Sequence, residues 1–109
     1  MHYTLTNFVN DSQARNQLHK RSLRVGDIII LKTINSVYLI KVLEEEQYVV
    51  SGGWFDKNNI SPVTLTIRGC TWGGSVIKND IIAACGLHLE FGNKVVTSRI
   101  TKIFHISSN

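Results

Sequence analysis

The sequence has no run of about eighteen apolar residues, so neither a transmembrane helix nor a membrane partner is expected. Its first residues, Met1–Asn7, lack the basic stretch and apolar run of a secretory signal peptide, and the expected location is therefore the cytoplasm. The chain also lacks the GxxxxGKS/T and GxGxxG patterns that cradle nucleotides. No cofactor is expected.

Cysteine is scarce: the chain has two, Cys70 and Cys85. Neither has a second cysteine or a histidine at zinc-ligand spacing, so no metal site is expected. A single pair in a cytoplasmic chain favours two buried thiols over a disulfide. Cys70 stands in a glycine-flanked bend near Arg68 and is the better candidate for a reactive thiol, whereas Cys85 is expected in the core.

Other catalytic patterns are missing as well. The histidines form neither HExxH nor HxH, so each is expected to be a surface or hydrogen-bonded structural residue. Carboxylates cluster only in the run Glu44–Glu46, which is typical of a solvated hairpin tip. The sequence therefore favours a protein that is not an enzyme. The histidines are His2, His19, His88 and His105.

What the chain does contain indicates one globular domain. It has 109 residues, of which 43% are hydrophobic and 18% charged. Twelve Lys and Arg against eight Asp and Glu give a formal charge of +4. Counted along the sequence, residues 1–24 carry +3, residues 25–60 carry −2 and residues 61–109 carry +3. This distribution permits a polyanion partner and does not require one.

The hydrophobic pattern is mainly that of strands. Short apolar runs between turn formers predict six or seven of them, and Pro62, the only proline, is expected to begin one. Residues 35–36 are expected to form a turn and residues 56–59 a polar loop. Residues 76–85 fit either a short helix or another strand. Residues 11–20 are expected to form a short helix, capped by Asn10 and Gln13. The predicted strands are residues 28–31, 37–43, 48–51, 63–68, 87–91, 94–100 and 103–106.

The hairpin over residues 87–100 carries the most specific prediction. Gly92–Asn93 is expected to be a two-residue turn. That register places Leu89 opposite Val96, and His88 opposite Thr97.

Together these elements predict an all-β or β-dominated α+β fold: a small SH3-like-sized barrel or a compact sandwich with a short N-terminal helix. Residues 1–24 are expected to form a basic arm or short helix, and residues 25–109 a single barrel-like domain. The segment Arg24–Ile29 resembles the opening of many small SH3-like barrel domains, in which a turn ending in Gly-Asp begins the first long strand.

Two nearly mirrored tetrapeptides, Ser51–Trp54 and Trp72–Ser75, are the strongest functional signal. A glycine pair beside a tryptophan lets the backbone approach a flat group or another chain, which predicts a binding face. The alternative is that the glycines form bulges or corners and the tryptophans fill the core. The predicted partner-binding residues are Gly52, Gly53, Trp54, Phe55, Trp72, Gly73 and Gly74.

The leading hypothesis is a binding module for a protein partner or for assembly. A homodimer through an open strand edge is one form of it. The second hypothesis is a nucleic-acid-binding barrel, with the basic ends on phosphates and aromatic residues stacked on bases. The alternative role for these basic residues is a solvated helix face or tail. The predicted phosphate contacts are Arg15, Lys20, Arg21, Arg24, Lys94, Arg99 and Lys102.

Overall fold

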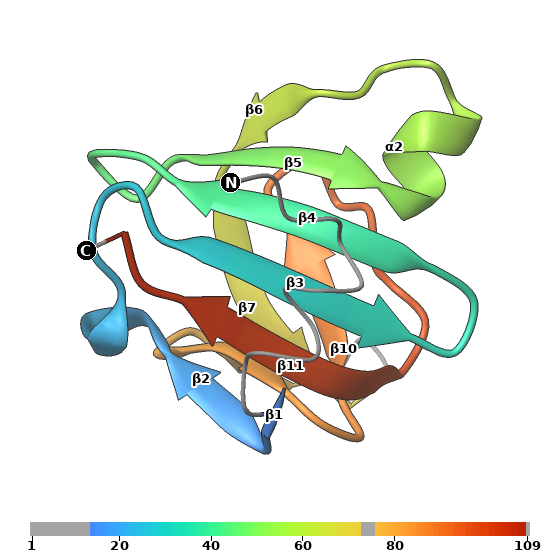
Figure 1. The fold of residues 1–109 in the computed structure, drawn as a ribbon. Coiled ribbons are helices and arrows are strands. Elements are labelled where there is room, and N and C mark those ends of the chain that lie inside the picture. Colours follow the sequence, from blue (N-terminus) through green and yellow to red (C-terminus); the bar gives the residue numbers. More distant parts are fainter. Residues whose placement is uncertain (1–13, 73–75, 109) are drawn as a thin grey trace.

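The computed structural model describes residues 14–72 and 76–108, and these fold into antiparallel sheets (Figure 1). The largest sheet has six strands in the order β1-β11-β3-β4-β5-β6. A three-stranded sheet, β10-β7-β8, lies behind it, and β2 pairs with β9. The strands of the large sheet are β1 (Ala14–Arg15), β3 (Ile28–Thr33), β4 (Val37–Val42), β5 (Tyr48–Gly52), β6 (Val63–Leu65) and β11 (Ile100–Ile106). The others are β2 (Gln17–His19), β7 (Ile67–Thr71), β8 (Ile77–Lys78), β9 (Ile81–Ala84) and β10 (His88–Phe91).

Two corners link these sheets. At Thr66 the chain leaves β6, which pairs with β5, and enters β7, which pairs with β10. At Asn16 it leaves β1, which pairs with β11, and enters β2, which pairs with β9. The strand-dominated fold predicted from the sequence is confirmed. The sheets are not closed into a barrel, and structural similarity to SH3-like domains remains a prediction.

Helical structure is limited in the described parts of the chain to the 3-10 turn η1 (Lys20–Ser22) and the helix α2 (Gly53–Lys57). Neither is long and apolar enough to cross a membrane.

The core forms where alternating side chains of the large sheet meet the smaller sheets. In β4, Tyr38, Ile40 and Val42 are buried while the residues between them are exposed, as a two-residue period requires. β3 departs from this alternation, because Ile30 is buried on the face opposite the core, between its cross-strand neighbours Leu39 and Phe104. The centre of the large sheet therefore has apolar contacts on both faces.

An aromatic cluster closes one end of this core. Phe55 of α2 is fully buried, and its ring packs edge-on against Phe91, with the ring centroids 5.0 Å apart, and against Tyr38 at 6.0 Å. The short helix is thus held to the sheets by one inserted side chain.

The N-terminal helix expected over residues 11–20 is wrong for residues 14–19. These residues form β1 and β2, and residues 1–13, including Asn10 and Gln13, lie outside the described residues. The burial of Leu18 explains the strand. In β2, Leu18 pairs with Ala83 of β9 and its side chain is buried. A helix over these residues would have too few apolar side chains at helical spacing to form a buried face. Residues 76–85 form no helix; they contain two short strands, β8 and β9, joined by a turn at residues 79–80.

The register predicted for the 87–100 hairpin is wrong by one residue. Val96 lies opposite Glu90 rather than Leu89, because the turn has three residues and ends at Lys94 with a positive φ of 72°. A one-residue shift exchanges the two faces of a strand. Thr97 is consequently buried and donates its hydroxyl to the Ser98 carbonyl, while Val96 points outward and is 45% exposed.

The loop expected at 56–59 begins instead inside α2, which ends at Lys57. The strand expected at 63–68 is divided by the corner at Thr66.

A buried carboxylate joins the start of β3 to the end of β11. Asp27 is 2% exposed and accepts hydrogen bonds from the Nε2 of His105 (2.6 Å) and from the backbone N–H groups of Arg24 and Ser108 (3.0 Å each). Burial by itself raises the pKa of Asp27, but these donors outweigh it and hold the pKa below the ordinary value of 3.8.

We therefore expect Asp27 to make stability depend on pH in the acid range. Because its folded-state pKa is lowered, the stabilisation is complete above the unfolded pKa of about 4 and is lost as the pH falls through the folded value. Asp27→Asn should lower the urea midpoint at neutral pH and flatten the acid decline. Urea unfolding at pH values from about 7 to about 2.5 measures both. The exposed Asp80→Asn is the control, and equal acid declines in wild type and Asp27→Asn would contradict this role.

Candidate functional site

Two glycines shape the site by letting the end of β5 approach β4. Gly52 and Gly53 have positive φ angles of 93° and 46°. A Cβ at Gly52 would collide with the carbonyl oxygen of Val37, and one at Gly53 with the ring of Tyr38. Only glycine fits both the backbone angles and the space. The glycines therefore serve the site by positioning the next residue, Trp54.

The direction of the Trp54 side chain is fixed by its neighbours. Its backbone N–H donates to the Tyr38 hydroxyl at 3.2 Å. The adjacent residue, Phe55, enters the core, and its ring meets the Trp54 indole edge-on at 5.4 Å between centroids. The indole is left 41% exposed at the surface.

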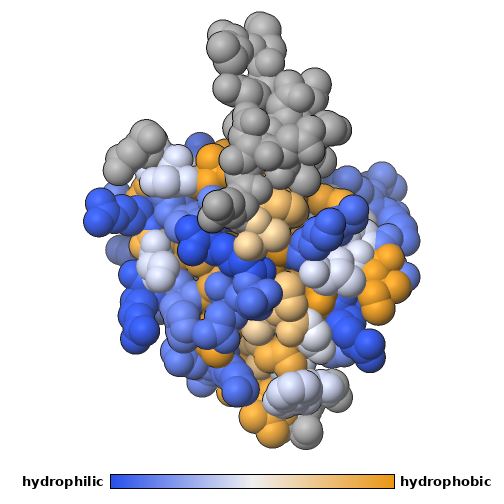
Figure 2. Space-filling model, turned by 60° about the horizontal axis from the view of Figure 1, so that its bottom comes forward, coloured by the Kyte–Doolittle hydropathy of each residue, from blue (hydrophilic) through white to orange (hydrophobic). Residues whose placement is uncertain are grey.

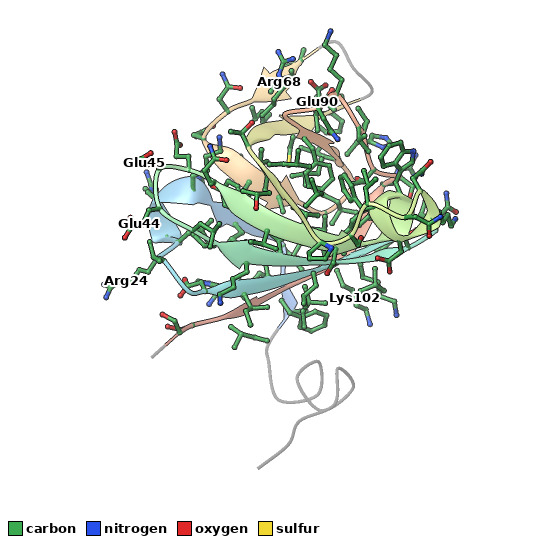
Figure 3. All side chains as sticks on the ribbon, turned by 90° about the horizontal axis from the view of Figure 1, so that it is seen from above. Arg24, Glu44, Glu45, Arg68, Glu90 and Lys102 are labelled. Carbon is green, nitrogen blue, oxygen red and sulfur yellow. The ribbon has the colours of Figure 1, made fainter. Side chains whose placement is uncertain are left out.

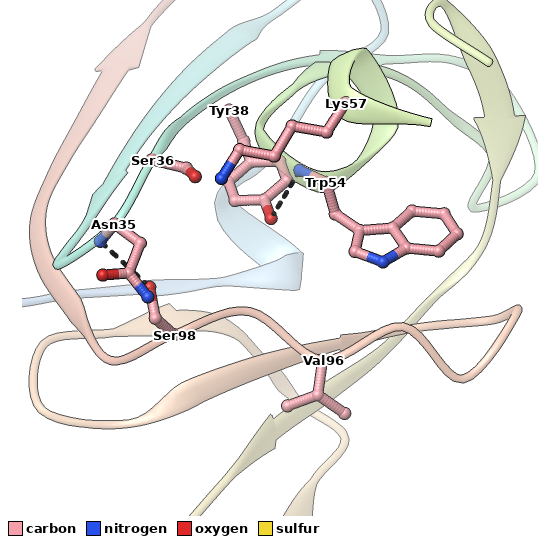
Figure 4. A pocket seen from close by; sticks show the side chains of 7 residues that line it. All are labelled: Asn35, Ser36, Tyr38, Trp54, Lys57, Val96 and Ser98. Carbon is pink, nitrogen blue, oxygen red and sulfur yellow. Dashed lines mark hydrogen bonds between the residues drawn. The ribbon is translucent and has the colours of Figure 1, made fainter. Parts of the chain in front are cut away.

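Trp54 is one wall of a cleft of about 170 Å³ (Figure 4). Across from it lies Val96, the residue that the hairpin register turns outward. The Tyr38 ring also lines the cleft. The ammonium group of Lys57 extends toward Ser36 in Figure 4. This half of the cleft offers an apolar slot beside a cation.

The other half of the cleft is polar and internally braced. The Asn35 N–H donates to the Ser98 hydroxyl at 3.2 Å, and that hydroxyl donates to Thr33 at 2.8 Å. These bonds tie the β3–β4 turn to the segment before β11. Within the part of the chain that the structure describes, the Asn35 side-chain amide and the Lys57 ammonium have no hydrogen-bond partner. Both remain available to a ligand.

Of the predicted partner-binding residues, Trp54 alone lines this cleft with its side chain. Phe55 is fully buried and supports Trp54 from the core. Trp72 is 65% exposed, but it comes after the far end of β7. It is five residues from Ile67 and so roughly 16 Å along the strand from the aromatic cluster. Gly73 and Gly74 lie outside the described residues.

The predicted phosphate-contacting residues are spread over opposite ends of the molecule. Arg24 precedes the first residue of β3, whereas Arg99 precedes β11, whose first residue pairs with the last residue of β3. Because β3 has six residues, the two arginines are about 20 Å apart along the strand. In Figure 3, Arg24 lies with Glu44 and Glu45 on one side and Lys102 on the other. Arg15 pairs with Ile103 in β1, and Lys94 ends the hairpin turn.

Two further predicted basic residues, Lys20 and Arg21, share an open hollow with Glu46 and Asp80. The Lys20 ammonium donates to the Ile67 carbonyl at 3.1 Å. The basic ends therefore do not form one continuous surface.

The thiols are poorly placed for catalysis. Cys70 is fully buried in β7, and burial raises its pKa to about 11. Cys85 donates to the Thr101 carbonyl at 3.5 Å, and burial raises its pKa as well. The Nδ1 of His88 lies 2.8 Å from the Thr97 carbonyl oxygen, a backbone contact rather than a catalytic pairing. Among residues 14–72 and 76–108, no three His, Cys, Asp or Glu side chains gather as a metal site would require.

Reasoning from the sequence missed five cleft residues: Asn35, Ser36, Lys57, Val96 and Ser98. It interprets Asn35 and Ser36 only as turn formers, and Lys57 only as part of a polar loop. It places Val96 toward the core because of the shifted register. A three-residue turn with Lys94 in the left-handed region is the signal that would have placed Val96 outside.

Comparisons with protein-family models, with curated proteins and with solved structures found no significant match for this chain. The cleft itself is therefore the basis for inferring a function.

We expect Cys70 to resist alkylation in the folded protein. With a pKa of about 11, roughly one thiol in ten thousand is ionised at neutral pH, and the sulfur is also shielded. Cys85→Ser isolates Cys70, whose labelling by a chromogenic disulfide should begin only on unfolding in urea. Rapid labelling of native Cys85→Ser protein would instead restore the reactive-thiol hypothesis.

We also expect alanine substitutions of the two neighbouring aromatic residues of α2 to lower the free energy of unfolding by different amounts. Phe55→Ala removes a fully buried ring and should destabilise the fold by about 3–5 kcal/mol. Trp54→Ala truncates a half-exposed side chain and should cost about 1 kcal/mol. Chemical denaturation of the two variants measures the difference. Equal losses would mean that Trp54 belongs to the core.

Proposed function

We propose that this protein is a small non-enzymatic binding module that holds a protein partner at the Trp54 cleft. The observation that supports this most directly is the exposed indole of Trp54 facing Val96 across a cleft whose backbone is positioned by Gly52 and Gly53. Tryptophan is among the residues that dominate binding energy at protein interfaces. A cytoplasmic location is part of the proposal.

The size of the cleft favours a side chain over a free metabolite. Pockets for small molecules are typically about 300–1,000 Å³, and this one is about 170 Å³ and open. One side chain of a partner segment would fill the slot between Trp54 and Val96, with its backbone extending over the polar half.

Self-association is the second form of this proposal. Several large apolar side chains are exposed, among them Ile34 at 62% and Trp72 at 65%. On the face seen in Figure 2, hydrophobic residues form separate patches between hydrophilic ones. The cleft, not a broad apolar surface, is therefore the feature on which we base the proposal.

Nucleic-acid binding has less support, because the basic residues are distributed over two ends and Lys20, Arg21 and Arg24 have acidic neighbours. If the partner is a nucleic acid, its binding constant should fall steeply as the salt concentration rises. For each phosphate that the protein neutralises, a tenfold rise in salt should lower the logarithm of the binding constant by about 0.7–0.9.

A displayed library of random peptides tests the proposal. Peptides enriched on the folded wild-type protein should lose at least about tenfold in affinity for Trp54→Ala, as expected at an interface hot spot, and keep their affinity for Trp72→Ala. Tryptophan fluorescence and circular dichroism confirm that both variants are folded. Failure to enrich any peptide, or enrichment of peptides that bind Trp54→Ala equally well, would overturn the proposal.

A further inference from the structure

Among the described residues that line the Trp54 cleft, the charged one is a cation, Lys57. Lys57 lines the cleft, and Arg99 is the next residue after Ser98 of its polar wall. The Arg99 carbonyl accepts from the N–H of Ile34, which holds this segment against the β3–β4 turn. Both cations are exposed. A partner that enters the cleft contacts Lys57 directly, and Arg99 adds positive charge next to the polar wall.

Two more lysines strengthen the field without touching the cleft. Lys32 and Lys102 are cross-strand neighbours at the same end of β3 and β11, and both are exposed. They point to the outer side of the large sheet. They therefore contribute only to the electrostatic attraction of an acidic partner as it approaches, which extends over a Debye length of about 8–10 Å.

The nearest acidic side chains are already engaged. Asp56 of α2 turns back to accept the N–H of Gly52 at 3.0 Å. Glu90, opposite Val96, is paired with Arg68 at 3.2 Å, and its side chain is 13% exposed. The acidic tip Glu44–Glu46 lies at the other end of β4, about 20 Å along the strand and beyond the Debye length.

We propose that the cleft binds a partner segment in which an apolar side chain stands next to acidic residues. The apolar side chain lies between Trp54 and Val96, and a neighbouring carboxylate accepts from the Lys57 ammonium and the Asn35 side-chain amide. This inference rests on the proposed function, since it names the chemistry of the partner at the same site.

Four synthetic peptides of equal length separate the two parts of the inference. The first carries one phenylalanine flanked by aspartate and glutamate, and the second replaces these acids by serine. The third replaces them by lysine, and the fourth keeps the acids but replaces phenylalanine by alanine. Fluorescence anisotropy of labelled peptides measures affinity at low and at high salt.

The acidic phenylalanine peptide should bind best, the serine peptide several-fold more weakly and the lysine peptide weakest. Exposed ion pairs contribute up to about fivefold each, and salt should narrow these differences by screening. The alanine peptide should lose at least as much as the serine peptide, because the slot is then empty.

Lys57→Glu supplies the decisive variant, and Lys78→Glu is the matched control. Lys78 is an exposed lysine of β8 outside the cleft lining, so the two variants have the same net charge. Lys57→Glu should reverse the preference, with the lysine peptide binding roughly fivefold or more better than the acidic one. Lys78→Glu should keep the wild-type order.

The outcomes distinguish this inference from the function on which it rests. If phenylalanine peptides bind through Trp54 whatever their charge, and Lys57→Glu changes nothing, the cleft binds a partner but the acidic preference is wrong. If no peptide shows binding that depends on Trp54, the proposed function fails too. A single-stranded oligothymidylate that displaces the acidic peptide, and that binds Trp54→Ala as well as wild type, would assign the cations to nucleic acid and overturn the inference.

Discussion

The close approach of the chain at Gly52 and Gly53 to β4 is the constraint on which the candidate site depends. A Cβ at either position would collide with Val37 or Tyr38, so this contact exists only because both side chains are absent. It turns β5 directly into α2. The short helix can then insert Phe55 into the core and still present Trp54 at the surface. One backbone contact thus determines which of two adjacent aromatic residues is buried and which is presented at the cleft.

The opposite wall of the cleft depends on a different local constraint. The three-residue turn ending at Lys94 sets the register that buries Thr97 and exposes Val96. Hydrogen bonds among Asn35, Ser98 and Thr33 then join this wall to the large sheet. Because the two walls come from segments about forty residues apart, the cleft is a product of sheet packing and not of any one motif.

Charge adds selectivity to this shape. The net charge of +4 is unevenly distributed over the chain, and the acids near two groups of cations are placed differently. At the end with the hollow, Glu46 and Asp80 face Lys20 and Arg21, whereas at the cleft Asp56 and Glu90 are held by Gly52 and Arg68. Neither of the two acids at the cleft forms an ion pair with Lys57. Because of this difference, the net charge gives little support to an extended surface that binds a polyanion. It gives more support to a local contact between the cleft and an acidic group of a partner.

The sequence by itself determined the strand-rich class and the positions of the β3–β4 and β4–β5 hairpins, because a two-residue hydrophobic period and local turn formers act within a few residues. It was sufficient for the Ile28–Thr33 and Val37–Val42 strands and for the acidic tip between β4 and β5. It also singled out Trp54. Tertiary structure decided whether residues 14–19 became helix or strand, because their hydrogen-bond partners are in β9 and β11. It likewise separated Trp72 from Trp54, buried Phe55 and Cys70, and brought Asn35, Lys57 and Val96 together. These outcomes depend on contacts between distant segments, and no local pattern encodes which distant segment will supply the partner.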